Sequence, residues 1–294
     1  ALLELVQDRP LRSLVTASEN TLENQYFRVQ LSGIGEVLSI YDKRAGREVI
    51  PEGQPANRLQ LFQDGPEREA AWNVHTTSTT REYPWDGDCS LRVTENGPVR
   101  ATIRVERNHR ETRLIQDIML YDNKPRIDFR TWVDWRELQT MLKAAFPLAI
   151  HAEQATYEVQ FGAIQRPTHR NTSWDEEKFE VAAQRWADLS EGGYGVSLLN
   201  DCKYGHDALG NVLRLTLLRG PEYPDPEADL GEHEFTYSLL PHEGDWRQGG
   251  TVQQAWQLNV PLFAVPTDRQ QSSVCFMRVD GPAIVETVKP AEDG

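Results

Sequence analysis

Cysteine is scarce in this chain of 294 residues, which contains only Cys89, Cys202 and Cys275. Three widely separated cysteines cannot form a disulfide framework or a CxxC metal knuckle. No apolar run approaches the roughly 18 residues that a membrane-spanning helix needs, and residues 1–12 lack the pattern of a secretory signal. We therefore expect a cytoplasmic protein that has no membrane partner.

Positive charge is also in short supply. Lys and Arg number 31 against 45 Asp and Glu, which gives a net charge of −14, and the acidic excess is spread along the chain. Binding to a nucleic-acid backbone needs clustered cations, so we expect no nucleic-acid partner. The sequence contains no internal repeat and no low-complexity segment.

Alternation of apolar and polar residues is the strongest pattern that is present. Residues 25–31 alternate, a turn with Gly33 and Gly35 follows, and residues 37–41 are again strand-like, which predicts a β-hairpin. Many β-branched and aromatic segments come after it with few helices between them, so the sequence predicts an all-β fold, a large antiparallel sandwich. The further expected strands are 99–106, 113–121, 126–134, 156–162, 195–199, 212–218 and 234–240.

Helical patterns are confined to two segments. Residues 250–258 form the clearer one, which Pro261 would end. Residues 175–187 form the other, although 180–189 could equally be a strand. We expect one or two short helices on a β sandwich.

Acidic residues and histidines gather between residues 225 and 242. Residues 225–229, Glu232, His233 and His242 include ligand types for zinc or calcium, but no established metal motif is present. We expect a solvated acidic loop here. Glu232 and Glu234 would face one side of a strand, so a paired-carboxylate acid/base site is a weaker alternative.

Two dense polar segments are the candidate binding loops. The first covers residues 166–175, with Trp174 as a stacking platform, and the second covers 200–207. Loops on a rigid sheet often carry binding groups, whereas the alternative is that they satisfy the backbone or line a domain interface. The candidate residues are Arg166, His169, Arg170, Asn171, Tyr204, His206 and Asp207.

Six stretches resemble a known family, in order along the chain. They are TLENQYFRVQL (21–31), GEVLSIYDKRAGREVI (35–50), NRLQLFQDGP (57–66), FGAIQRPTHRNTSWD (161–175), RWADLSEGGYGVSLLNDCKYGHD (185–207) and GEHEFTYSLLPHEGDW (231–246). Together they are similar to the C-terminal β-sandwich region of glycoside hydrolase family 38 α-mannosidases, in the cytosolic, vacuolar and bacterial branch.

The resemblance implies a supersandwich related to the galactose mutarotase fold. Residues 18–270 would form this domain, 1–17 would be a lead-in from a catalytic part, and 271–294 would begin a further β segment. The parent enzyme would be a retaining α-mannosidase that removes terminal α-linked mannose with zinc or another divalent cation. Retention needs two carboxyl groups about 5 Å apart.

In that family the catalytic and metal-binding residues belong to an N-terminal α/β domain, which nothing here resembles. The resemblance therefore implies that this chain holds no catalytic residue and no metal, and that it is inactive alone. The implied partners are the chain's own catalytic domain and a mannose-containing oligosaccharide. The face left without that domain could also let the chain self-associate as a homo-oligomer.

Two other functions remain open. A free-standing carbohydrate-binding sandwich would use the tryptophans and residues 166–175 as its platform. A mutarotase-like aldose epimerase would need a histidine acid and a glutamate base in one cleft. His169, His206, His233 and Glu234 supply those residue types, but the sequence does not show that they converge.

Overall fold

The computed structural model describes residues 14–74, 76–263, 265–266, 275, 277–281 and 283–292. Residues 1–13 of the expected lead-in, and 271–274, 276, 282 and 293–294 of the expected further β segment, lie outside the described residues. The chain divides into two compact units. Arg12–Pro261 is one, and Ala1–Leu11 together with Leu262–Gly294 is the other. Every helix and strand of the described residues lies in the first unit.

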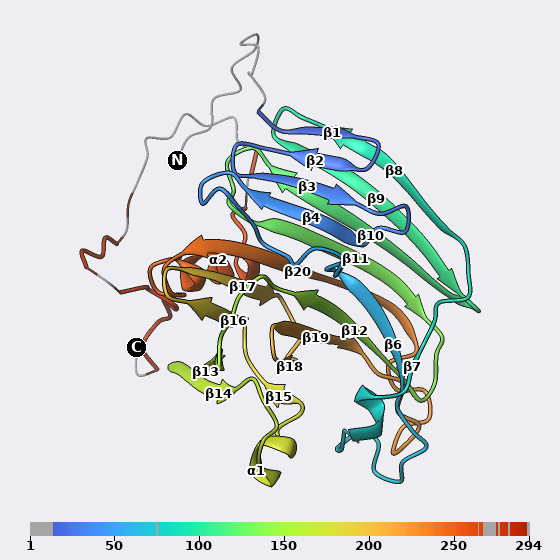
Figure 1. The fold of residues 1–294 in the computed structure, drawn as a ribbon. Helices are drawn as coiled ribbons and strands as arrows, with labels where there is room; N and C mark the ends of the chain where they lie inside the picture. The colour runs from blue at the N-terminus through green and yellow to red at the C-terminus, as the bar shows by residue number, and fades with distance from the viewer. Residues whose placement is uncertain are drawn as a thin grey trace. The chain divides into compact units, whose positions relative to one another are not determined.

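Twenty strands within the described residues form three antiparallel sheets (Figure 1). The first sheet has five strands in sequence order and contains the expected hairpin as its third and fourth strands. Its members are β1 (Thr16–Ser18), β2 (Thr21–Glu23), β3 (Phe27–Leu31), β4 (Val37–Asp42) and β5 (Arg47–Glu48).

The second sheet has nine strands and forms the long layer of the sandwich. In spatial order its strands are β14 (Gly162–Pro167), β13 (Gln154–Val159), β16 (Trp186–Glu191), β17 (Tyr194–Asn200), β20 (Gly231–Glu243), β11 (Ile127–Trp135), β10 (Thr112–Tyr121), β9 (Arg100–His109) and β8 (Cys89–Asn96).

The third sheet has six strands and carries the polar face described below. Its order is β15 (Val181–Ala182), β18 (Gly205–Leu209), β19 (Val212–Leu218), β12 (Thr140–Pro147), β6 (Arg58–Gln63) and β7 (Glu82–Tyr83). The helical elements are the 3-10 turn η1 (Thr76–Thr79), α1 (Ser173–Glu176) and α2 (Thr251–Asn259).

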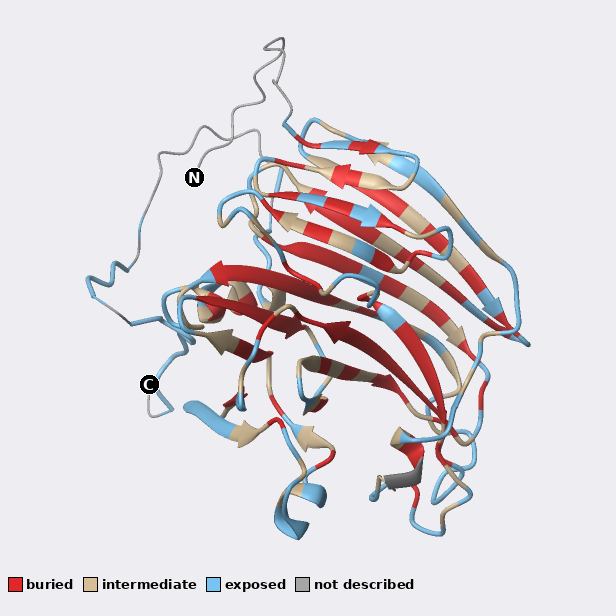
Figure 2. Cartoon of the chain, in the orientation of Figure 1, coloured by how far each residue is buried: buried red, intermediate tan, exposed pale blue. Residues whose placement is uncertain are grey.

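One apolar core joins the three sheets. In β3 the side chains of Phe27, Val29 and Leu31 are buried and the two residues between them are exposed, because successive side chains point to opposite faces of a sheet. The same core cluster includes residues of the nine-stranded and six-stranded sheets, such as Phe129 and Phe146. Figure 2 shows buried residues in red along strands of each layer. The expected all-β, antiparallel supersandwich is confirmed.

The helix expected at 250–258 is present as α2, which packs on β16 and β17. The helix expected at 175–187 is wrong, since α1 has only four residues and Trp186 begins a strand. Apolar residues in this segment are spaced as they would be on one face of a helix, but the spacing has a different cause. Phe179, Ala183 and Trp186 are all buried, but the first two flank the short strand β15 and the third begins β16, so no helix face buries them.

Candidate functional site

The six-stranded sheet carries a buried charged cluster on the face opposite the apolar core. In β12 the side chains of Leu142, Ala144 and Phe146 join the core cluster, so Lys143 and Ala145 point to the other face. All eight residues of β12 are buried. A segment before β15, which contains Glu180, contributes a carboxylate that covers Lys143.

Lys143 is the centre of this cluster. Its Nζ lies 2.7 Å from Asp207 Oδ2 and also pairs with Glu180. Arg214 Nε donates to Asp207 Oδ1 at 2.8 Å, and the Thr216 hydroxyl donates to Glu180. Two cations and two carboxylates therefore neutralise one another, and each carboxylate accepts two charged or polar donors.

Burial and pairing oppose each other in the pKa values of this cluster. Burial alone would raise the pKa of Asp207, but the charges of Lys143 and Arg214 outweigh it and lower that pKa. Burial would lower the pKa of Lys143, but Glu180 and Asp207 outweigh it and raise that pKa. Both groups stay ionised and locked together, so Asp207 is a structural anchor and neither group is free to exchange a proton with a substrate.

His206 lies on β18 beside Asp207, yet its side chain points into the core. It is fully buried, its Nδ1 lies 3.2 Å from the Tyr204 carbonyl oxygen, and its ring meets the Tyr157 ring edge-on at 6.4 Å. Burial lowers the pKa of His206 to about 4. His206 is therefore a neutral core residue, and Tyr204 contributes its backbone while its side chain is exposed.

The other candidate loop is divided between two environments. Arg166 on β14 is half-buried, with its guanidinium carbon 5.3 Å from the centre of the Tyr157 ring. His169 and Asn171 are exposed, and the His169 Nδ1 accepts from the Asn171 backbone at 3.4 Å. Arg170 is half-exposed on the same loop. Arg166 and His206 thus flank one tyrosine, whereas residues 169–171 face solvent.

The acidic region near residue 230 is solvated. Glu232 and Glu234 share one exposed face of β20, and Glu234 pairs with the exposed Arg130. The His233 Nε2 lies 2.8 Å from the Asp229 carbonyl oxygen. No group of three or more His, Cys, Asp or Glu side chains that could hold a metal is found among the described residues.

A second polar network, which sequence reasoning missed, lies between the nine-stranded sheet and α2. Asp188 Oδ2 accepts from Ser197 Oγ at 2.8 Å and lies 2.9 Å from His242 Nε2. Ser197 also bonds to Thr251 of α2 at 2.7 Å. All four side chains are buried. These hydrogen bonds attach the helix to the sheet. The sequence pattern that could have indicated the network is the presence of polar residues, such as Asp188 and Ser197, inside otherwise apolar strands.

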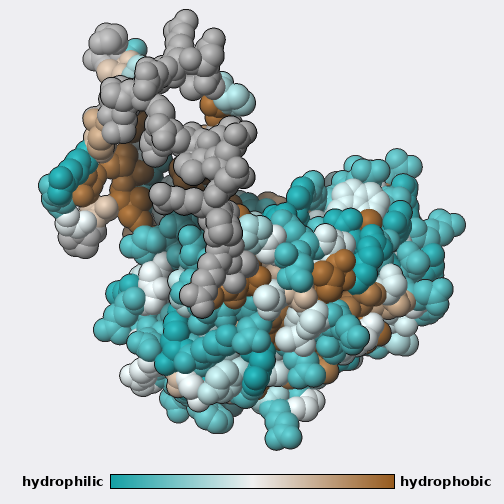
Figure 3. Space-filling model, turned by 90° about the horizontal axis from the view of Figure 1, so that it is seen from above, coloured by the Kyte–Doolittle hydropathy of each residue, from teal (hydrophilic) through white to brown (hydrophobic). Residues whose placement is uncertain are grey.

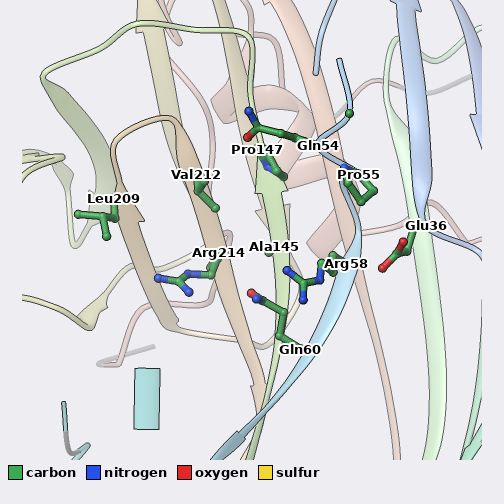
Figure 4. A pocket seen from close by; sticks show the side chains of 11 residues that line it. Glu36, Gln54, Pro55, Arg58, Gln60, Ala145, Pro147, Leu209, Val212 and Arg214 are labelled. Carbon is green, nitrogen blue, oxygen red and sulfur yellow. The ribbon is translucent and has the colours of Figure 1, made fainter. Parts of the chain in front are cut away.

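A hollow of about 540 Å³ opens on the same face of the six-stranded sheet as the charged cluster (Figure 4). Arg58, Gln60 and Arg214 line it together with Ala145 and apolar side chains of neighbouring strands. Sequence reasoning missed these residues because they come from β6, β12 and β19, which are distant in the chain. Arg58 and Gln60 lie within the stretch 57–66, which carries part of the family resemblance. That resemblance was the one feature of the sequence that could have drawn attention to them.

One face of the sandwich is mainly polar. Figure 3 shows hydrophilic residues over much of the visible side of the sandwich, with small apolar patches between them. None of the helices in the described residues has the length and apolar character that crossing a bilayer requires.

Comparison with known proteins gives a consistent assignment. Residues 22–227 match the family model described as the glycosyl hydrolases family 38 C-terminal domain. The chain is 43% identical over 280 residues to human "Alpha-mannosidase 2C1", covering 92% of this chain and 27% of that protein. It is 38% identical over 286 residues to "Alpha-mannosidase G" of Dictyostelium discoideum, covering 93% of this chain and 26% of that protein. The chain thus spans about a quarter of these relatives.

The fold is also similar to that of a solved structure. A crystal structure of an α-mannosidase from Enterococcus faecalis V583 superposes with a TM-score of 0.74 at 17% identity, and the match covers 88% of this chain and 33% of that one. The family model accounts for most of the three-sheet sandwich, including β6, β12, β18 and β19. This chain therefore belongs to the family of glycosyl hydrolase family 38 C-terminal domains.

Proposed function

We propose that this chain is the non-catalytic C-terminal domain of a cytoplasmic, retaining α-mannosidase that removes terminal α-linked mannose from oligosaccharides. The observation that carries the proposal is its 43% identity to an α-mannosidase over 92% of the chain but only 27% of that protein. The catalytic groups would then belong to a part of the enzyme that corresponds to the rest of that relative, outside the region matched by this chain.

The ionisable groups of the domain support a structural role. Retaining hydrolysis requires a carboxylate nucleophile and a carboxylic acid about 5 Å apart. The carboxylates of the buried Asp207 and the half-buried Glu180 already bind Lys143 and their polar neighbours. No group of three or more metal-ligating side chains is found among the described residues. We place the cation of the parent enzyme in its catalytic domain.

In this proposal the sandwich supports the catalytic domain. Arg166, His169, Arg170, Asn171 and Tyr204 would contact that domain or border its sugar pocket, whereas the buried His206 and Asp207 would only support the Tyr204 loop. The Lys143 cluster would hold β18, and therefore the Tyr204 loop, in a fixed position. The exposed side chains of His169, Asn171 and Tyr204 provide polar groups for such an interface.

The first test is hydrolysis of an aryl α-mannoside, with added zinc or cobalt, by this chain and by the full product of its reading frame. We expect activity only in the longer product. Activity in the 294-residue chain would overturn the proposal that this domain is non-catalytic.

The interface role needs a separate test in the longer product. We expect alanine at Arg166, His169, Arg170 or Asn171 to alter hydrolysis or domain association. The control is alanine at Arg113, an exposed residue of β10 that pairs with Glu106 and does not belong to the loop. Unchanged kinetics and association for all four loop variants would remove the loop from the interface.

The epimerase alternative gains no support from the pair His206 and Glu234. His206 is buried among core residues, and its pKa is lowered to about 4. Glu234 lies on an exposed face of β20 and is paired with Arg130. These two groups belong to different sheets and face different environments, so they do not form one acid/base cleft.

A further inference from the structure

The hollow on the six-stranded sheet arises from one short side chain between two long ones. Ala145 of β12 is the register partner of Arg58 on β6 and of Arg214 on β19. Neighbouring strands are about 4.8 Å apart, so the two arginine backbones are about 10 Å apart across the alanine. The small alanine side chain leaves open space between them and forms the floor of the hollow. Figure 4 shows Arg58 directed over this floor.

Gln60 forms part of the wall next to this floor. Its side chain is directed toward the space over Ala145 (Figure 4), and the residue is only 7% exposed. Its Nε2 donates to Glu82 Oε2 at 2.8 Å, while its Oε1 is buried and has no hydrogen-bond partner among the described residues. Because this oxygen has almost no accessible surface, a ligand in the hollow would pack against the Gln60 side chain without reaching Oε1.

The charges around the hollow favour a neutral ligand. Arg58 pairs with Glu82, and Arg214 pairs with Asp207. Glu36 adds a carboxylate to the lining, so these five groups have a formal charge of −1. A guanidinium has five N–H donors, and the ion pairs leave some of them for a neutral oxygen. The lining therefore presents both donors and acceptors without an excess of positive charge.

The remaining walls are apolar. Pro55, Leu209 and Val212 line the hollow beside these polar groups, and its volume of about 540 Å³ lies in the range of about 300–1,000 Å³ that small-molecule sites occupy. A pyranose combines hydroxyl groups, which both donate and accept, with apolar C–H faces. Its two kinds of surface match the two kinds of wall.

We propose that this hollow is a non-catalytic binding site for a neutral saccharide. Ligand hydroxyls donate to Glu36 and accept from Arg58 and Arg214, while a C–H face packs on Val212. The choice of a mannoside as the probe rests on the proposed function, but the requirement for a neutral hydroxylated ring rests on the lining alone. The ligand is a free sugar or the end of a glycan.

Calorimetric titration of the 294-residue chain tests the site. The probes are methyl α-mannoside, an α-linked mannotriose and inorganic phosphate. We expect a dissociation constant on the order of 1 mM for a saccharide and no binding of phosphate. Tighter binding of the trisaccharide would identify a glycan end, and equal binding would identify a single sugar. Binding of phosphate alone, or of no probe, would overturn the proposal.

Two variants locate the binding. Arg58→Ala removes a half-exposed donor, and Glu36→Ala removes the carboxylate acceptor of the lining. We expect each to weaken binding about tenfold, because a hydrogen bond to a charged group is lost. Arg113→Ala, at an exposed pair on β10, is the matched control and should bind as the parent chain does. Thermal unfolding verifies that each variant is folded.

The result also separates this proposal from the function of the whole protein. If both variants bind the saccharide as the parent chain does, the site lies elsewhere and the proposal is wrong. If the longer product hydrolyses an aryl α-mannoside but the hollow binds no saccharide, the proposed function stands and this site fails. If the hollow binds a saccharide but the longer product hydrolyses no α-mannoside, the site stands and the proposed function fails.

Discussion

Lys143 Nζ lies 2.7 Å from Asp207 Oδ2, and the two side chains are only 0% and 1% exposed. The pair joins β12 to β18 across β19, on the face of the sheet opposite the core. Such a contact fixes strands that are not direct neighbours. It also explains how a lysine is accommodated in a strand whose eight residues are all buried.

Replacing Lys143 by methionine should destabilise the chain by about 3 kcal/mol or more. The substitution keeps the side-chain length but removes the cation that pairs with Glu180, and it leaves the buried Asp207 with Arg214 as its one remaining partner cation among the described residues. Breaking a buried pair from one side is costly. Urea unfolding at neutral pH measures the loss. Arg130→Ala breaks the exposed pair with Glu234 and should cost less than about 1 kcal/mol. Equal losses in the two variants would contradict the role of the buried cluster.

Stability should fall between neutral and mildly acidic pH, in part because of His206. Burial lowers the pKa of this imidazole from 6.5 to about 4, so the unfolded chain binds more protons in that window. The contribution of the neutral His206 to the free energy of unfolding is complete above about pH 6.5 and is lost as the pH falls toward 4. It amounts to about 2 kcal/mol between about pH 7.5 and about pH 5.

His206→Phe tests this pH dependence, since phenylalanine keeps a ring against Tyr157 and cannot take up a proton. Urea unfolding at the two pH values should show a decrease smaller than that of the parent chain by about 2 kcal/mol. The exposed His151 provides the control, and His151→Gln should retain the full decrease. An unchanged decrease in His206→Phe would show that other groups cause it.

Alanine at Gly195 should disturb the network beneath α2. A Cβ atom at this position would overlap Ser190 Oγ and the ring of His242, and both groups lie next to Asp188. Forcing an atom into such a packed site costs about 1–3 kcal/mol. Gly192 has open space around its Cβ position within the described part of the chain, so Gly192→Ala is the matched control. Chemical denaturation of both variants measures the difference. Equal midpoints would contradict the close packing around Gly195.

Removing the Tyr237 hydroxyl should cost about 1–3 kcal/mol of unfolding free energy. The hydroxyl donates to Asn57 Oδ1 at 2.7 Å and accepts from Gln116 Nε2 at 2.8 Å. All three side chains are buried, so Tyr237→Phe leaves Asn57 without its donor. Tyr204→Phe changes an exposed side chain and should be nearly neutral. Urea unfolding compares the two, and a neutral Tyr237→Phe would refute the importance of this network.

The local sequence was sufficient to predict secondary structure where an element faces the core on one side only. The alternation in residues 27–31 determined β3, because every second side chain is buried. The expected hairpin and the helix at 250–258 are both present. In contrast, Phe179, Ala183 and Trp186 have helical spacing but lie in a loop and a strand, since tertiary burial can produce the same spacing without a helix.

The sequence by itself determined the all-β class, the alternating strands and, through its ordered resemblance, the family of this domain. Tertiary structure decided which polar residues meet. It placed His206 in the core and Asp207, one residue later, in a charged cluster on the opposite face. It also placed Arg58 and Arg214 on either side of Ala145. The physical reason is that strand pairing brings together residues far apart in the chain, and local propensity contains no information on that register.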